Sequence, residues 1–194
     1  SYVIKITQLD TNLLDTDNTY ECETMLEAKT YLNNADINNR YKLEISNEYP
    51  NTYLDDNSSL SNCITLSSIY LPDKITYISR NCFSGCTNLK EVYFGKSETV
   101  TLADNCFSNC GFELLSIPSN INLTGNCFQG NLKLKTVIFN NNNLGGFRDC
   151  TALSTIILIN NVNIIKSQAF RNCTELVNVD LTMVNDTIES NAFL

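Results

Sequence analysis

The sequence predicts an α/β solenoid, in which stacked coils share one parallel β-sheet along one side. From residue 60 to residue 194, an aromatic or leucine anchor recurs every 19–24 residues, and in each complete unit a strand-like segment follows it. The first fifty residues lack this recurrence and combine two strand-like segments with one helix-like segment. Fixed periods of about 20–50 residues are typical of repeat architectures, in which each unit buries its apolar face only against its neighbours.

Six units share the same order of residue types. The anchors are Leu60, Phe83, Phe107, Phe128, Phe147, Phe170 and Phe193, and three residues after them come Cys63, Cys86, Cys110, Asn131, Cys150 and Cys173. Each complete unit then continues as an alternating segment such as "LKEVYF" or "LKTVIF", whose period of two predicts a strand with one buried face. A polar, often asparagine-rich turn follows, and in most units an apolar residue such as Ile78 or Leu102 leads to the next anchor.

The stretches "NCFSGCTNLKEVYF", "SQAFRNCTELVNVDL" and "SNAFL" resemble the BspA-type leucine-rich repeat, whose unit runs roughly I-x-x-x-A-F-x-x-C-x-x-L-x-x-I-x-L-P. The resemblance covers about residues 60–194 and implies a right-handed solenoid of leucine-rich-repeat coils. It also implies the surface-associated or secreted proteins of bacteria and protists, often with adhesive or recognition roles. Cys82, Cys106, Cys127 and Gly146 depart from the alanine of the family's pattern, and "GFELLSI" lacks one residue, so we expect altered coil geometry there.

The repeat divides the chain into two parts. We expect an N-terminal cap of strand, helix and strand over residues 1–50, and a solenoid of about six coils over residues 51–194. Because the sequence stops at "ESNAFL", where a new coil opens, we expect an open C-terminal end. Such an end either continues in a longer chain or docks against another copy, because uncovered solenoid ends associate readily.

The helix of the cap is expected within "ECETMLEAKTYLNN", residues 21–34. Asn18 and Glu21 are spaced as a capping box, and Cys22, Met25, Leu26 and Leu32 repeat at helical spacing. The strands are expected at "YVIKI" and "YKLEI". This unit is too small to hold a core alone, which favours a cap over a separate functional domain.

The recurring cysteines allow three interpretations. Zinc binding is the weakest, because the spacing is C-x₃-C and the chain has no histidine. Disulfides are conceivable because adjacent coils bring cysteines close, although nine is an odd number. We favour free thiols packed as small hydrophobic groups, in a ladder containing Cys86 and its equivalents and a second column of Cys82, Cys106 and Cys127.

Composition excludes several functional classes. The net charge of −8 comes without a basic cluster, which argues against nucleic-acid binding. No apolar run approaches the roughly 20 residues that span a bilayer, so no membrane insertion is expected. Without histidine the commonest general base is missing. We therefore expect no enzyme, no catalytic residue, no metal site and no cofactor.

The outward side of the predicted sheet is the candidate site. In "LKEVYF", Leu89, Val92 and Phe94 are expected to point inward, and Glu91 and Tyr93 outward. Corresponding outward positions form an apolar and aromatic diagonal, and the partner-binding residues that we predict are Tyr70, Tyr93, Leu114, Ile138, Ile157 and Glu91. Contiguous patches of this kind mark interaction sites, although exposed strand positions also favour such residues for their β-propensity.

Two functions of different classes follow. The first is a non-catalytic interaction or adhesion module that binds a protein or glycan partner through the sheet. The second is a structural subunit that assembles head-to-tail through its solenoid ends. With the family resemblance, the first function places the protein at the cell surface or outside the cell.

Overall fold

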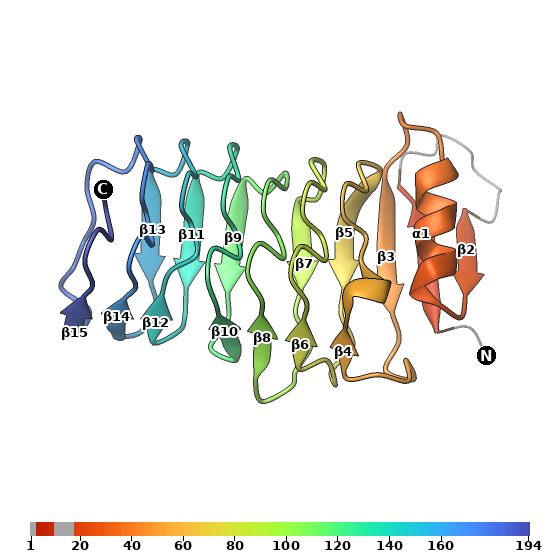
Figure 1. Cartoon of the computed structure of the whole chain (residues 1–194), viewed down its shortest axis with the longest axis horizontal. Helices are drawn as coiled ribbons and strands as arrows, with labels where there is room; N and C mark the ends of the chain where they lie inside the picture. The colour runs from red at the N-terminus through yellow and green to blue at the C-terminus, as the bar shows by residue number, and fades with distance from the viewer. Residues whose placement is uncertain (1–2, 10–17) are drawn as a thin grey trace.

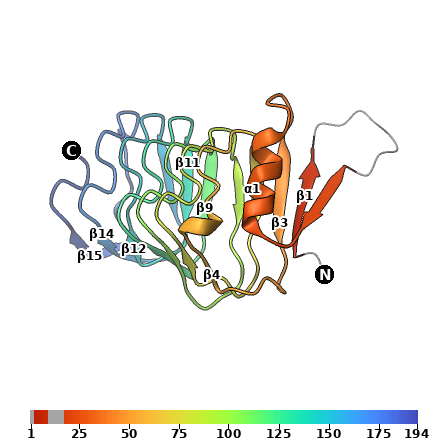
Figure 2. The ribbon, with the colours of Figure 1, turned by 45° about the vertical axis from the view of Figure 1, so that its right-hand side comes forward.

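The computed structural model describes residues 3–9 and 18–194, which form one elongated stack of coils (Figure 1). The N-terminal elements lie at one end of the stack and the C-terminus at the other (Figures 1 and 2). One continuous apolar core runs along the stack, from Ile4 to Ala192. The predicted solenoid is confirmed, and its regular structure is mostly strand, with a single α-helix among the described residues.

The N-terminal cap contains one more strand than the sequence suggested. Strand β1 (Ile4–Gln8) lies between β2 (Thr19–Cys22) and β3 (Tyr41–Ile45) and pairs with both in antiparallel register. Helix α1 (Met25–Asn34) buries Met25, Ala28 and Leu32. Strand β3 in turn pairs in parallel with the first strand of the repeats, so that the cap and the coils share one sheet.

The predicted start of the helix is wrong. Thr24 is the N-cap, and its Oγ1 accepts a hydrogen bond of 3.2 Å from the backbone nitrogen of Glu27. The Glu27 carboxylate reaches back to the backbone nitrogen of Glu23, as in a capping box shifted from Asn18 and Glu21. The segment Thr19–Cys22 is a strand that pairs with β1. Leu26, which the helical spacing predicted to lie on the apolar face of the helix, is 66% exposed.

The predicted strands of the repeats form one long row, called here the long-strand row. After β3 it contains β5 (Leu66–Tyr70), β7 (Glu91–Tyr93), β9 (Leu114–Ile117), β11 (Thr136–Phe139) and β13 (Thr155–Leu158). Strands β3, β5 and β7 pair in parallel, as do β9, β11 and β13. No pairing joins β7 to β9 among the described strands, so the row consists of two sheets.

The break between β7 and β9 lies at the unit that lacks a residue. Gly111 donates a backbone hydrogen bond of 2.9 Å to the carbonyl oxygen of Leu89 in the preceding coil. A β-carbon at Gly111 would lie 2.4 Å from the carbonyl oxygen of Thr87, closer than side chains tolerate. The shortened turn therefore fits against its neighbour only as glycine, and the row of strands is interrupted at this departure from the family's pattern.

A second row of strands, which the sequence did not predict, runs along another side of the coils (Figure 2). It contains β4 (Tyr53–Leu54), β6 (Tyr77–Ile78), β8 (Val100–Leu102), β10 (Ile121–Leu123), β12 (Asn143–Leu144), β14 (Val162–Ile165) and β15 (Val184–Ile188), and a 3₁₀ turn (Asp56–Ser58) follows β4. The pairings are parallel and divide this row also into two sheets. The expectation of a single parallel sheet was therefore incomplete.

The last unit departs from the repeat. Its segment "LVNVDL", residues 176–181, was predicted to be a strand, but it has no strand in the structure. Val179 is only partly buried, whereas its equivalent in β11, the inward-facing Val137, is completely buried. The long-strand row of the described residues therefore ends at β13, and the unit contributes only β15 to the second row.

A column of stacked phenylalanine rings forms the centre of the core. Phe83, Phe107, Phe128, Phe147, Phe170 and Phe193 lie at the anchor position of successive coils, and neighbouring ring centroids are 5.2, 5.6, 5.6, 6.0 and 5.4 Å apart. The rings are close to parallel, with interplanar angles of 5–21°. Each anchor from Leu60 to Phe170 also donates its backbone N–H to the next coil, over 2.7–3.0 Å.

The cysteine ladder is buried as expected, and its thiols also donate hydrogen bonds. Cys86 and Cys110 donate from Sγ over 3.2 Å to the anchor carbonyl oxygen of the preceding coil, and Cys150 and Cys173 do so over 3.3 and 3.1 Å. Asn131 takes the same place with its side-chain nitrogen, 3.0 Å from the carbonyl oxygen of Phe107. The position thus requires a small donor, which explains why asparagine can replace cysteine there.

The nine thiols are all free and buried. Burial raises the pKa of Cys82, Cys127 and Cys150 to about 12, so these groups carry their proton at neutral pH. A buried thiol that stays protonated is a poor nucleophile and a poor metal ligand. Among the described residues no group of three or more cysteine, aspartate, glutamate or histidine side chains is arranged to hold a metal ion.

Asparagines make the tight bends of each coil possible. Asn62, Asn109 and Asn172 lie two residues after an anchor with φ of 59°, 53° and 60°, where glycine and asparagine are the best tolerated residues. In the turn after β9, the side chain of Asn120 donates to the carbonyl oxygens of Gly95 and Ser97 in the preceding coil, over 3.2 and 2.9 Å. No helix in the described part of the chain is long and apolar enough to cross a bilayer.

Asn131 gives a direct test of the ladder. Its Oδ1 is buried and has no hydrogen-bond partner, and a buried unsatisfied polar atom costs about 1–3 kcal/mol. We expect Asn131→Cys to raise the free energy of unfolding by about 1 kcal/mol, because a thiol keeps the bond to the Phe107 carbonyl and removes the unpaired oxygen, while the Phe128 carbonyl still accepts from Cys150. Asn131→Ala should lower it, because the Phe107 carbonyl loses its side-chain donor. Urea unfolding measures both, and a cysteine variant less stable than the native protein would contradict the donor role.

Candidate interaction surface

The candidate surface is the outward side of the long-strand row, called here the sheet face. The structure places all six predicted residues on it, and Tyr93, Leu114 and Ile157 are 47, 54 and 43% exposed. Glu91 is exposed, and Tyr70 and Ile138 are partly covered. Ile69, Val137 and Phe139, the chain neighbours of Tyr70 and Ile138, are fully buried, and Val92 and Ile156 pack partly buried against the core. The alternation of the strands therefore directs the six side chains away from the core.

Strand register puts the six residues into two parallel lines. Tyr70 and Tyr93 are direct cross-strand neighbours, as are Ile138 and Ile157. Leu114 instead pairs with Thr136 and belongs to the neighbouring line. The predicted diagonal is therefore two patches, an aromatic one on β5 and β7 and an aliphatic one on β9, β11 and β13, with the break in the row between them.

The aromatic patch is built around two stacked tyrosines. The rings of Tyr70 and Tyr93 lie 4.1 Å apart between centroids, with an interplanar angle of 14°. Lys42 from the cap holds its ammonium 5.3 Å from the centroid of Tyr70, and forms an ion pair of 3.0 Å with Glu44. The Tyr93 hydroxyl donates to the Glu91 carboxylate over 3.3 Å. These contacts pre-order a flat surface with a charged rim.

Tyr93 of this patch stays uncharged in neutral solution. Hydrogen bonding to Tyr70, followed by the negative charge of Glu91, raises the pKa of the Tyr93 phenol to about 12. A neutral phenol offers an apolar ring face together with a hydrogen-bonding hydroxyl. Tyrosine is enriched at protein interfaces for this combination.

The aliphatic patch carries no charge at its outward strand positions. In addition to Leu114, Ile138 and Ile157, these positions are Ser116, Thr136 and Thr155. Ile159, which follows β13, is 51% exposed and extends the patch beyond the strand. A sheet side in contact only with water is usually polar, so this run of exposed aliphatic side chains favours an interaction surface.

The cap adds charged residues to the sheet face that the sequence interpretation missed. Lys5 on β1 and Lys42 and Glu44 on β3 project from the same side as Tyr70, and β3 pairs directly with β5. The alternation in "YKLEI" contained this information, because Tyr41, Leu43 and Ile45 are the buried residues.

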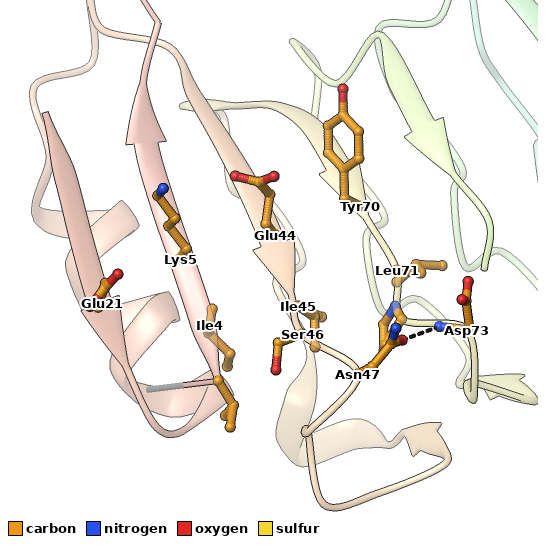
Figure 3. Close-up of a pocket in the computed structure, with 12 residues that line it drawn as sticks. Ile4, Lys5, Glu21, Glu44, Ile45, Ser46, Asn47, Tyr70, Leu71 and Asp73 are labelled. Atoms are coloured by element: carbon orange, nitrogen blue, oxygen red, sulfur yellow. Dashed lines mark hydrogen bonds between the residues drawn. The ribbon is translucent and has the colours of Figure 1, made fainter. Parts of the chain in front are cut away.

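An open pocket of about 450 Å³ lies at the cap end of the sheet face. It is formed where β1 begins, where β2, β3 and β5 end, and where the turns after β3 and β5 follow (Figure 3). Figure 3 shows the side chains of Lys5, Glu44 and Tyr70 in successive strands above it, and Asn47 bonded to the backbone of Asp73. The pocket thus continues the aromatic patch toward the N-terminus.

The family comparison matches the repeats. The model of the BspA type leucine rich repeat region matches in six copies, over residues 56–146 and 143–194. These residues make up well over half of the chain. No curated protein sequence matches the chain.

Solved leucine-rich repeat structures are similar to this one. A leucine-rich cell surface protein from Faecalibacterium prausnitzii is 21% identical over 81% of this chain and 41% of that chain, with a TM-score of 0.52. A leucine-rich repeat protein from Bacteroides ovatus is 26% identical over 62% of this chain and 38% of that chain, with a TM-score of 0.48. The leucine-rich repeat protein of T. pallidum is 16% identical over 70% of this chain and 83% of that chain, with a TM-score of 0.42. The chain spans about two fifths of the length of the first two.

Two adjacent residues test the assignment of the two sides of the sheet. We expect Phe139→Ala to lower the free energy of unfolding by about 3–5 kcal/mol, because Phe139 is completely buried. Ile138→Glu should change it by less than about 1 kcal/mol, since outward substitutions have small effects. Urea unfolding of both variants measures the difference. Equal destabilisation would show that Ile138 belongs to the core.

Proposed function

Because the chain belongs to the BspA-type leucine-rich repeat family, we propose that it is a non-catalytic module that binds a protein partner through its sheet face. The observation that carries this proposal is the exposure of Tyr93, Leu114 and Ile157 in the two patches of the sheet face. The family also supports a role in interaction or at a surface.

The physical character of the surface favours a protein over other partners. Tyr93 is held by stacking on Tyr70 and by the hydrogen bond to Glu91, so little side-chain freedom is lost when a partner covers it. Leu114 and Ile157 supply exposed apolar surface, and its burial by a partner is favourable because water is removed from it. Ordered aromatic side chains next to exposed aliphatic side chains are typical of the residues that dominate the binding energy of protein interfaces.

We place this function at the cell surface or outside the cell. The support is the family, together with the likeness to a solved leucine-rich cell surface protein. Free cysteines would be exposed to oxidants there, but burial leaves these nine thiols protonated and out of reach.

The test is a selection from a phage-displayed peptide library on the immobilised protein. We expect enriched peptides to bind the native chain and to lose roughly tenfold or more in affinity on Tyr93→Arg and on Ile138→Glu, as for interface hot spots. The matched control is Tyr77→Arg, which changes a tyrosine that is 41% exposed on the second row. Peptides that bind the control as tightly as the native chain would support the sheet face.

Two results would contradict the proposal. Peptides that lose affinity on Tyr77→Arg but not on Tyr93→Arg would assign binding to the second row. The second result comes from light scattering. If the native chain and Tyr93→Arg form oligomers of the same size as the protein concentration rises, head-to-tail assembly through the ends of the stack is favoured instead.

A further inference from the structure

The segment of the last coil that forms no strand is attached to the preceding coil at both of its ends. On one side, Thr174 donates from Oγ1 to the carbonyl oxygen of Thr151 over 3.3 Å. On the other, Val162 donates its backbone N–H to the carbonyl oxygen of Met183 over 2.9 Å. Residues 175–182, which lie between these two attachments, are called here the strap. The strap belongs to the coil at the C-terminal end of the stack (Figure 1).

A backbone hydrogen bond that recurs just before the strands of the long-strand row is replaced in the strap. Lys135 donates its N–H to the carbonyl oxygen of Glu113 over 2.9 Å, and Ser154 donates to that of Lys135 over 3.1 Å, so each coil bonds to the one before it. Val177 has the equivalent place in the strap, but its N–H donates to Glu175 over 3.0 Å. The strap therefore begins with a local bond where the other coils bond to their neighbour.

The bond that recurs just after the strands is replaced in the same way. Ile159 donates its N–H to the carbonyl oxygen of Phe139 at the end of β11, over 2.9 Å. Thr182, its equivalent one coil later, donates its N–H to Oδ1 of Asp180 over 2.9 Å, and its Oγ1 donates to the same oxygen over 2.7 Å. Turns in which an aspartate side chain accepts from the backbone two residues on compete with strand pairing. The Asp180 turn thus holds the strap away from β13.

Strand β13 is left with one open edge. Because the N–H of Ile159 points to β11, the alternation of a parallel ladder directs the N–H groups of Ile156 and Leu158 toward the strap. No backbone bond from the described residues reaches them. The inward side chains of Ile156 and Leu158 are also partly exposed, whereas their equivalents in β11, Val137 and Phe139, are completely buried. Both the backbone and the core are therefore uncovered at this edge.

We propose that the strap moves between this open arrangement and a closed one, in which residues 178–181 form a strand paired in parallel with β13. The 23-residue spacing of the last three anchors sets the register. In this register Val179 and Leu181 turn inward beside Ile156 and Leu158 and cover them. Leu181 is 38% exposed in the open arrangement, so closure buries apolar surface on both strands.

The strap controls the end of the sheet face next to the aliphatic patch. In the open arrangement, the free edge of β13 can accept an extended segment of a partner by strand addition. In the closed arrangement the edge is paired, and Asp180 lies beside Ile157 in the outward line. A charged side chain on an edge strand opposes further pairing. This effect on binding rests on the function proposed above, whereas the movement of the strap does not.

Amide hydrogen exchange of the full chain, measured by NMR, tests the strap. The N–H groups of Ile156 and Leu158 are free in the open arrangement and bonded in the closed one. In the native chain we expect them to exchange at least roughly tenfold faster than those of Val137 and Phe139, which bond to β13. Asp180→Ile removes the acceptor of the turn and should slow the exchange of Ile156 and Leu158 by roughly tenfold or more.

Two further variants identify the cause of the slower exchange. Asp186→Ile, a matched change at an exposed aspartate in β15, keeps the Asp180 turn and should leave Ile156 and Leu158 as in the native chain. Adding Val179→Asn to Asp180→Ile should restore fast exchange, because an amide side chain does not cover the core. Slow exchange that persists in this double variant would show that the protection does not come from the strap.

Two other results would overturn the inference. Ile156 and Leu158 that exchange as slowly as Val137 in the native chain would show that the edge is not open. Exchange that is unchanged in Asp180→Ile would show that the turn does not hold the strap. Neither result affects library-selected peptides that lose affinity on Tyr93→Arg, so the strap can fail while the sheet-face function stands. Absence of such peptides, with the expected exchange observed, would defeat the function alone.

Discussion

The contact between successive coils is the interaction on which the rest of the structure depends. A single coil contains short strands of two to five residues and cannot bury its own apolar side chains. From Phe83 to Phe170, stacking solves this by three recurring devices: a phenylalanine ring on a phenylalanine ring, an anchor N–H bonded to the next coil, and a thiol, or in one coil the Asn131 amide, bonded to the preceding one. The two kinds of hydrogen bond keep polar backbone groups paired, and the stacked rings keep the core apolar.

This stacking also determines what the outward side of the coils can do. Strand pairing fixes the spacing and direction of outward side chains, so a residue on one coil is held beside its counterpart on the next. Tyr70 and Tyr93 stack for this reason, and Ile138 lies beside Ile157. The sheet face is thus a rigid array whose chemistry can change from coil to coil without disturbing the core, as it does across the break after β7.

The periodic features of the fold could be predicted from the sequence, and the local ones could not. The anchor column, the buried cysteines and the outward direction of Tyr93 followed from spacing and alternation alone. The second row was missed because strands of two or three residues such as Tyr77–Ile78 are too short to show a period. The helix start was displaced because antiparallel pairing with β1 overrode a plausible cap at Asn18. The pocket at the cap end of the sheet face is lined by residues of the cap and of the first coil that are far apart in the sequence, and no repeat pattern connects them.

Amide hydrogen exchange of the anchor residues tests the central claim most directly. The backbone N–H groups of Phe83, Phe107, Phe128 and Phe147 each bond to the following coil, and the account predicts that they exchange slowest and with one common free energy of opening. In Phe107→Ala the protection of all four should fall together, because the coils are stable only as a stack. Graded protection, in which Phe107→Ala affects its own coil and leaves Phe83 and Phe147 unchanged, would contradict the claim that the coils depend on one another.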